Sequence, residues 1–369
     1  MTDLVIARDS FWRRVWPVLL LSFRAQWIFY VIPALYLASN AVLLEAVPHH
    51  GIAPVLELLA ELLSFSLPVG LIVMIVLRLF QYVAFEKPAS PARALAGETR
   101  ELVLRPARLI NGLPVFAAMI FFNKAMVELK PAIPAIHPFA WDVAFMHLDR
   151  MLHFGIDPWR LLQPIMGFDA VTFIVNMAYN FWFVALFGAW FWFGFRKEAS
   201  LVRTQFFLAY MLIWWVGGGL LAVAFSSAGP VYYSAIGLSP DPYAPLMSYL
   251  HEVDARIPIW CLKTQALLWD GYIGKVPALG ISAFPSMHNA SAVLFAIATW
   301  RVSRAVGIFF AIYAAVILLG SVHLGWHYAV DGYAGIALGV LGWWAAGPIA
   351  RWFDGLATSR RYNEGLASL

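Results

Sequence analysis

Residues 284–331 read FPSMHNASAVLFAIATWRVSRAVGIFFAIYAAVILLGSVHLGWHYAVD, and this stretch decides the fold. It holds two polar motifs, Phe284–His288 and His323–Asp331, separated by two apolar runs with a short basic turn between them. Two helices of about 17 residues, each rising 1.5 Å per residue, would cross most of a bilayer's hydrocarbon layer and return. The stretch therefore predicts a membrane hairpin that places both polar motifs at the same membrane surface.

The composition of the whole chain agrees with this hairpin. Hydrophobic residues make up 62% of the 369 residues, charged residues make up 12%, and the mean hydropathy is +0.74. Soluble domains carry about a quarter charged residues, so these values indicate a membrane protein. The single cysteine, Cys261, excludes an internal disulfide and a thiolate metal cluster. We therefore expect an all-α, polytopic integral membrane protein with about eight transmembrane helices.

The distribution of lysine and arginine predicts the orientation of the chain. Basic clusters fall at 8–24, 87–105, 196–203, 301–304 and 351–361, which is every second connection between the expected spans. Such clusters stay on the cytoplasmic side, so both termini are expected in the cytoplasm and the polar motifs outside it, in a bacterial cytoplasmic membrane. The net charge of +4 comes from these loops and gives no reason to expect a nucleic-acid partner. The expected spans are 27–46, 62–85, 108–124, 170–195, 205–226, 287–302, 305–322 and 327–349.

Three parts of the chain are expected. Residues 1–107 would form an N-terminal interfacial helix, two transmembrane helices and a cytoplasmic loop. Residues 108–350 would form a six-helix catalytic domain, and 351–369 a cytoplasmic tail. The extracytoplasmic connection 125–169 is long and rich in Pro, His, Asp and aromatic residues. We expect it to lie on the membrane surface and cover the site, with its Asp residues capping or solvating a loop.

Three ionisable side chains in the two motifs are the candidate catalytic residues. His288, His327 and Asp331 stand where the bilayer makes charge costly, which marks functional candidates. The i, i+4 spacing of His327 and Asp331 puts them on one helical face, where the carboxylate can hold one imidazole nitrogen. This set suits phosphoryl transfer without a metal. His327 would attack phosphorus, Asp331 would fix the tautomer of His327, and His288 would transfer the proton. Proton transfer of this kind raises the reaction rate by about 10²–10⁴-fold.

Phosphate oxygens need donors, and several residues on the same face of the membrane could supply them. Ser286 stands at a helix start, where amide groups favour anions, although simple helix capping is an equal alternative. His323 lies one turn before His327 and would either bind phosphate or serve the structure. The candidate cations are Lys124, Lys130, Arg150, Arg256, Lys263 and Lys275.

Both motifs resemble those of the type 2 phosphatidic acid phosphatase superfamily. That family's second motif reads Pro-Ser-x-His, matched by Pro285, Ser286 and His288, and its third ends His-x-x-x-Asp, matched by His327 and Asp331. The resemblance implies a nucleophilic role for His327 and a proton-donating role for His288.

Two departures from the phosphatase pattern point to a particular branch. Ser321 stands where phosphatases of the family carry an arginine, and Arg105–Pro106 lacks the first-motif lysine, since Glu98 occupies that position. The His-Tyr-x-x-Asp form is more similar to the inositol phosphorylceramide synthase and sphingomyelin synthase branch, over roughly 120–340. This similarity implies a phosphotransferase that moves a phospho-headgroup, such as phosphoinositol, from a phospholipid to a lipid alcohol.

Other functions are compatible with the same residues. Water as the acceptor would make the protein a lipid phosphate phosphatase. His288, His323, His327 and Asp331 could instead bind zinc or iron, or the histidines could relay protons in a transporter. For the favoured function we expect no cofactor, and we expect a phospholipid or lipid phosphate substrate and the lipid bilayer as partners.

Overall fold

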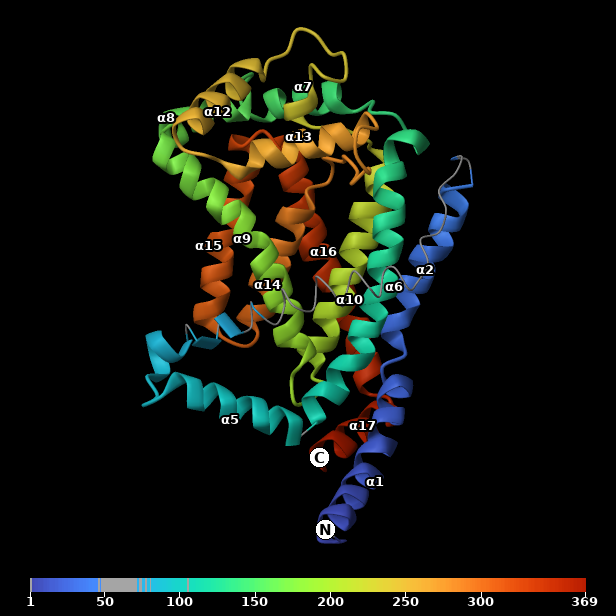
Figure 1. The fold of residues 1–369 in the computed structure, drawn as a ribbon. Coiled ribbons are helices and arrows are strands. Elements are labelled where there is room, and N and C mark those ends of the chain that lie inside the picture. Colours follow the sequence, from blue (N-terminus) through green and yellow to red (C-terminus); the bar gives the residue numbers. More distant parts are fainter. Residues whose placement is uncertain are drawn as a thin grey trace.

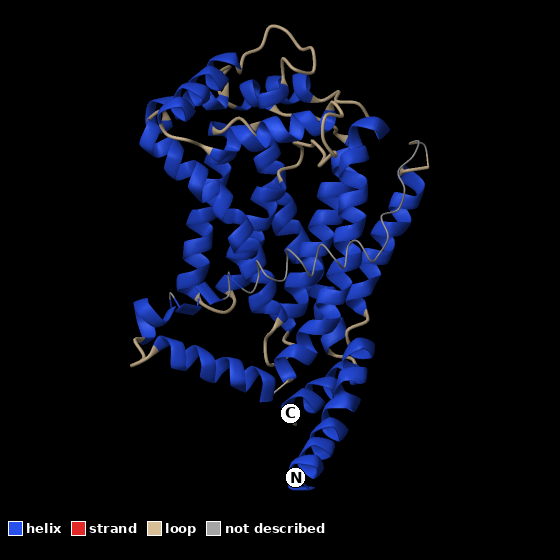
Figure 2. Cartoon of the chain, in the orientation of Figure 1, coloured by secondary structure: helices blue, strands red, loops and turns tan. Residues whose placement is uncertain are grey.

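The computed structural model describes residues 2–45, 47, 72, 75–76, 78–79, 81–104 and 106–369, and their regular secondary structure is helical. Within these ranges no strand occurs (Figure 2). The α-helices are α1 (Thr2–Ala25), α2 (Ile28–Leu43), α5 (Pro91–Leu104), α6 (Ala107–Ile136), α7 (Asp142–Leu152), α8 (Pro158–Met166), α9 (Asp169–Gly194), α10 (Leu201–Trp215), α11 (Ala222–Ala224), α12 (Ala244–Arg256), α13 (Trp260–Tyr272), α14 (Met287–Trp300), α15 (Arg304–His323), α16 (Ala329–Asp354) and α17 (Ala357–Ala367).

Five helices in the described ranges are long and apolar enough to cross a membrane: α6, α9, α10 with its continuation to Ala224, α15 and α16. The α1–α2 pair, which is bent by 46°, makes a sixth candidate span if the two helices are counted as one broken span. A π-helical turn, Val216–Leu221, joins α10 to α11. These helices confirm a polytopic membrane protein, and the exact count of eight spans stays a prediction.

Two expected spans differ from the helices observed, and a third lies largely outside the described residues. The expected span 108–124 is only the first half of α6, which continues to Ile136. The expected span 287–302 corresponds to α14, whose 14 residues extend about 21 Å, less than the hydrocarbon thickness of about 30 Å. The expected span 62–85 falls mostly on residues that are not described.

The short helix α14 is the centre of the bundle, because α10, α15 and α16 all pack against it. Its contact with α16 is close enough to require glycine. A Cβ atom at Gly335 would lie 2.3 Å from the Ser286 carbonyl oxygen, and one at Gly339 would lie 2.7 Å from that of Ala290. Small residues of this kind let helix backbones approach within membranes. The beginning of α14 is therefore held directly against the beginning of α16.

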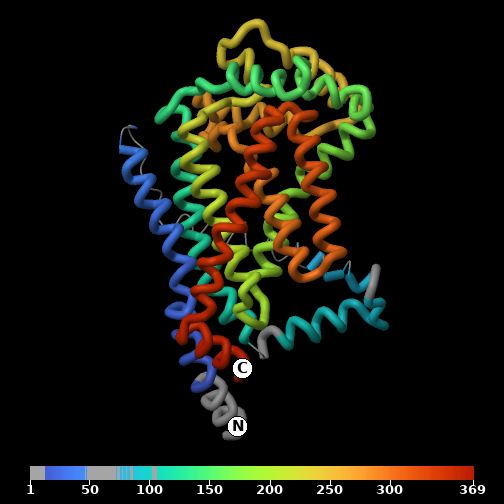
Figure 3. Tube along the Cα trace, turned by 180° about the vertical axis from the view of Figure 1, so that it is seen from behind, coloured from blue at the N-terminus to red at the C-terminus, as the bar shows by residue number. Residues whose placement is uncertain are grey.

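Helices α7, α8, α12 and α13 lie across one end of the bundle, and we call these four helices the roof (Figure 1). Helices α1, α5 and α17 lie at the opposite end, as the view from behind also shows (Figure 3). Helices α7 and α8 lie in the connection 125–169, which was expected to cover the site, and α12 and α13 lie between the expected spans 205–226 and 287–302. Residues 351–369, expected as a tail, contain the end of α16 and all of α17, which packs against α1.

Candidate active site

The two polar motifs meet under the roof, at the starts of α14 and α16. Ser286 directly precedes α14, and its backbone N–H donates to the carbonyl oxygen of Asp331 over 2.9 Å. With the close approach at Gly335, this hydrogen bond fixes one motif against the other at the level of the backbone. The hairpin formed by α14 and α15 thus returns the chain to the level from which it left.

His327 and Asp331 are in contact, as their spacing suggests. The distance from His327 Nδ1 to Asp331 Oδ2 is 3.3 Å, and the same carboxylate oxygen accepts the N–H of Tyr328 over 3.0 Å. Asp331 is fully buried and His327 is 8% exposed. A buried carboxylate at Nδ1 keeps a proton on that nitrogen, so the other nitrogen, Nε2, is left with its lone pair.

His288, in the first turn of α14, lies between aromatic rings of α9. Its ring is stacked on Tyr179 with 4.6 Å between the centroids, and it lies 4.3 Å from Trp182. Two residues earlier, the hydrogen bond from Ser286 to Asp331 joins the start of α14 to the start of α16. The residues flanking both imidazoles, on α14 and on the segment before α16, therefore meet at one junction.

The other candidate cations already have acidic partners or lie in the open. Arg150 Nε is 2.6 Å from Asp157, and Lys124 Nζ is 2.8 Å from Glu128, one turn further along α6. Lys263 is exposed on α13. Arg256 pairs with Asp169 and Lys275 pairs with Asp270.

Ser286 and His323 are both fully buried. Ser286 makes no side-chain hydrogen bond to the backbone of its helix, and its hydroxyl oxygen instead accepts from the Asn289 amide over 3.0 Å. His323 Nε2 is 2.9 Å from the hydroxyl of Thr172, which is itself 2.7 Å from the Tyr249 hydroxyl. His323 thus belongs to a polar network that joins α9, α12 and α15. A phosphate-binding role stays a prediction for Ser286 and for His323.

Sequence reasoning did not connect two acids of α7 with the site. Asp149 accepts the backbone N–H groups of Ala329 over 2.8 Å and of Val330 over 2.9 Å. Asp142 accepts the N–H of Gly229 and the Tyr328 hydroxyl, both over 2.8 Å. The available signal was their seven-residue spacing, which puts both on one face of a helix. Their partners lie far away in sequence, so the spacing alone could not name them.

Burial opposes the charge on both of these acids. It raises the pKa of Asp149 to about 6, although the two N–H groups act in the opposite direction. Burial also raises the pKa of Asp142, against the lowering effect of its backbone and hydroxyl donors. The hydrogen bonds to each carboxylate therefore offset part of the cost of burying its charge.

A sequence-family model described as the PAP2 superfamily matches residues 143–345, more than half of the chain. The chain belongs to the PAP2 superfamily. The matched range runs from α7 into α16 and includes both motifs. Members of this superfamily are phosphatases or phosphotransferases, so the chain is an enzyme of that general kind. No curated protein and no solved structure matches the chain.

Ser321, where PAP2 phosphatases are expected to carry an arginine, serves the local backbone here. Its carbonyl oxygen accepts the N–H groups of Trp326 over 3.0 Å and of His327 over 3.1 Å, and its hydroxyl donates to Leu318. This position therefore shapes the turn that presents His327 and supplies no positive charge. Glu98, at the position of the absent first-motif lysine, lies in α5 at the other end of the bundle, where it pairs with Arg78 (Figure 1).

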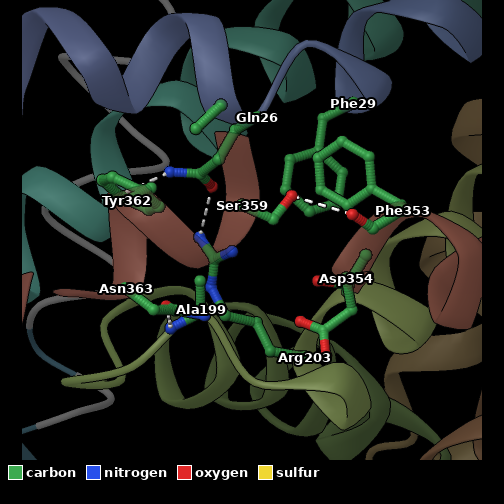
Figure 4. A pocket seen from close by; sticks show the side chains of 11 residues that line it. Gln26, Phe29, Ala199, Arg203, Phe353, Asp354, Ser359, Tyr362 and Asn363 are labelled. Carbon is green, nitrogen blue, oxygen red and sulfur yellow. Dashed lines mark hydrogen bonds between the residues drawn. The ribbon is translucent and has the colours of Figure 1, made fainter. Parts of the chain in front are cut away.

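The alternative of a metal centre has little geometric support in this PAP2 member. Within the described part of the chain, no three His, Cys, Asp or Glu residues are grouped so that they could hold a metal ion. A small cavity does occur at the opposite end of the bundle, between α1, α10, α16 and α17, and Arg203 and Asp354 line it (Figure 4). None of the site residues expected from the sequence lines that cavity.

Proposed function

We propose that this PAP2 member is a membrane-embedded phosphotransferase that acts on lipid phosphate esters through a phosphohistidine at His327. The observation that carries the proposal is the meeting of the His327–Asp331 pair with His288 at one end of the bundle, under the roof. Residues 108–350 would form the catalytic domain. The site would face the outer leaflet of a bacterial cytoplasmic membrane, with both termini in the cytoplasm.

The first step would transfer the phosphoryl group from the substrate to the enzyme. The Nε2 lone pair of His327 attacks phosphorus, and the bond between phosphorus and the leaving alcohol's oxygen breaks. Protonated His288 gives its proton to the departing alkoxide, so a neutral alcohol leaves. Asp331, through Nδ1, stabilises the positive charge that develops on the His327 ring.

The second step would reverse these roles with a new alcohol. Neutral His288 takes the proton of the acceptor hydroxyl, whose oxygen attacks the phosphorus of phosphohistidine. The P–N bond breaks and its electron pair returns to His327 Nε2. His288 is then protonated again, and the enzyme is ready for another substrate.

Charge on the phosphoryl oxygens would be balanced mainly by Lys130. Phosphoryl transfer asks for positioning and charge neutralisation more than for covalent help from the protein. Lys130 lies beside Gly280, in the segment that leads to the Phe284–His288 motif, whereas Arg150 already has a carboxylate partner. The free amides at the start of α14, next to Ser286, would add donors. Lys124, Lys263 and His323 remain weaker candidates for the same task.

We favour a lipid alcohol over water as the acceptor. Aromatic rings of α9 flank His288 and the His327 ring is almost buried, so little water can approach the phosphohistidine. A headgroup such as phosphoinositol, moved to a lipid hydroxyl, fits both this enclosure and the sequence resemblance. Water as the acceptor would make the enzyme a lipid phosphate phosphatase.

The test is a product assay with protein in bilayer nanodiscs. Phospholipids labelled in the phosphate group are supplied with and without ceramide or diacylglycerol, and labelled products are identified. We expect label in a new phospholipid only when the alcohol is present, and acid-labile label on the protein that is lost in H327A. Release of inorganic phosphate alone would favour the phosphatase. Unchanged turnover in H327A would refute the proposal. H147A, which removes an exposed α7 histidine, is the matched control.

A further inference from the structure

The roof helix α7 carries two buried acids that reach both histidine motifs. Asp142 and Asp149 are 1% and 2% exposed, and their seven-residue spacing aligns them along one face of α7. Buried carboxylates are costly unless hydrogen bonds satisfy them, so their partners show what the helix holds in place.

Asp149 holds the first turn of α16. Its two carboxylate oxygens each accept one backbone N–H, from Ala329 and from Val330. These amides belong to the group at a helix start that has no partner within the helix. They also lie between His327 and Asp331 in sequence. The carboxylate of α7 thus fixes the segment that sets the distance between the two members of the pair.

Asp142 accepts hydrogen bonds from two separate segments of the chain. One of its oxygens accepts the hydroxyl of Tyr328, the residue next to His327. The carboxylate also accepts the N–H groups of Ala228 and Gly229. The preceding residue, Ser227, accepts the N–H of Ala283 at its carbonyl over 2.9 Å and that of Phe284 at its hydroxyl over 3.2 Å.

Aromatic packing strengthens the connection to the His288 motif. Phe145, one turn after Asp142 on α7, stacks on Phe284 with 4.7 Å between the ring centroids. Phe284 begins the motif that ends at His288. Helix α7 therefore contacts the chain just before His288 through one stacked ring, and the chain just after His327 through two carboxylates.

We propose that Asp142 and Asp149 form an acidic clamp that positions His327 and His288 for phosphoryl transfer. This inference rests on the proposed function. The two acids are positioning residues: they act through the backbone and through Tyr328. Phosphoryl transfer requires phosphorus within reach of His327 and the oxygen that leaves or attacks within reach of His288, and a misplacement of about 1 Å can lower a rate by about 100-fold.

The clamp requires carboxylates and not merely polar groups of that size. An ionised carboxylate has acceptors on both oxygens, so Asp149 can accept two N–H groups at once. Asparagine has nearly the same shape, but its amide nitrogen is a donor and would face one of the N–H groups. An Asp→Asn change at Asp149 thus keeps the packing and removes one of the two hydrogen bonds to backbone N–H groups.

The experiment compares D149N, D142N and Y328F with the control D270N in nanodiscs, by steady-state kinetics and by hydrogen exchange. Asp270 is a partly exposed roof acid that pairs with Lys275. We expect kcat to fall about 10–100-fold in D149N and D142N, with KM within about threefold of wild type. Y328F, which removes one bond of the clamp, should lose about 2–10-fold. Amide exchange over 326–332 should accelerate in D149N and stay unchanged in D270N.

Exchange and turnover separate the clamp from the proposed reaction. Faster exchange over 326–332 in D149N supports the clamp even if the wild-type protein shows no phosphoryl transfer. Wild-type turnover that D149N and D142N leave unchanged, or exchange that D149N leaves unchanged, overturns it. Thermal melting of each variant shows that the comparison is made between folded proteins.

Discussion

Buried charged side chains have different hydrogen-bond partners at the two ends of the bundle. Under the roof, Asp142 and Asp149 bind backbone N–H groups, so each charge fixes a defined stretch of chain. At the opposite end, the fully buried guanidinium of Arg203 donates through one nitrogen to Gln26 and to the Asn111 carbonyl. Its Nε and Nη1 atoms have no hydrogen-bond partner among the described residues, and it lines the small cavity (Figure 4).

This contrast suggests that buried charged groups fix the positions of the site residues at the roof end and support helix packing at the opposite end. A buried charge with hydrogen bonds on all its polar atoms, as in Asp142 and Asp149, is restricted to one arrangement, whereas a partly hydrogen-bonded one, as in Arg203, tolerates several. Substitutions near the histidines should therefore change rates more than stability, and substitutions around Arg203 should do the reverse. Four predictions test this division, taken from the largest expected effect to the smallest.

Replacing the nucleophile should give the largest loss. H327Q should lower kcat by more than about 10³-fold, because no other group in the site is placed to carry the phosphoryl group. Turnover of labelled phospholipid measures this, with melting temperature as the control for folding. A loss of kcat of less than tenfold would show that His327 is not the nucleophile, and the two ends would then not differ in their effect on catalysis.

The charge on Asp149 should appear in the pH dependence of stability. The folded-state pKa of about 6 lies above the ordinary value of 3.8, so the folded protein binds the proton more tightly. Stability therefore falls as the pH rises from about 4 to about 6, by at most about 3 kcal/mol. Burial is the main cause of the raised pKa of Asp149; the N–H groups of Ala329 and Val330 lower that pKa, Asp331 raises it further and His153 lowers it.

Melting temperatures of wild type and D149N between pH 4 and pH 8 measure this effect. Wild type should lose stability relative to D149N across the lower part of that range and run parallel to it above about pH 7. A difference that does not vary with pH would mean that Asp149 keeps an ordinary pKa.

Lys130 should matter more than the other cations on its side of the membrane. K130M should reduce kcat/KM about 10–100-fold, because it removes the positive charge proposed to balance the phosphoryl oxygens. The exposed Lys263 provides the control, and K263M should stay within about twofold of wild type. Equal effects of the two changes would show that the phosphate charge is balanced elsewhere.

The smallest effect on rate is expected at the opposite end. R203M replaces a buried, partly satisfied charge with an apolar side chain of similar length. Such replacements are often neutral or stabilising by about 1–4 kcal/mol. We expect a melting temperature at or above that of wild type and turnover within about twofold. A tenfold loss of turnover would show that the two ends are coupled.

The sequence predicted the parts of the fold that repeat a simple pattern. Helices α9, α15 and α16 begin and end within a few residues of the expected spans, except that α16 runs on to Asp354. The span expected from the sequence, 108–124, stops at Lys124 because charged residues interrupt the apolar run there. The helix α6 itself is longer. In the structure, Lys124 and Glu128 pair across one turn, so the helix continues.

The candidate site divides in the same way. The contact of His327 with Asp331 follows from a local spacing, and their nearness to His288 follows from the length of one hairpin. The acids of α7 bind amides more than 80 residues away in one case and 180 in the other. No local pattern encodes such a pairing, which arises only when the roof is laid across the bundle.

Helix α7 also borders a strongly apolar corner. Met151 and Leu152 at its end are exposed, and Phe154 just beyond it is 94% exposed. In a bilayer these side chains would sit among lipid headgroups and upper acyl carbons. Detergent micelles offer a different curvature and lateral pressure at that depth. Rates measured in micelles would then report a loosened enzyme, and lipid composition would become a variable of the kinetics.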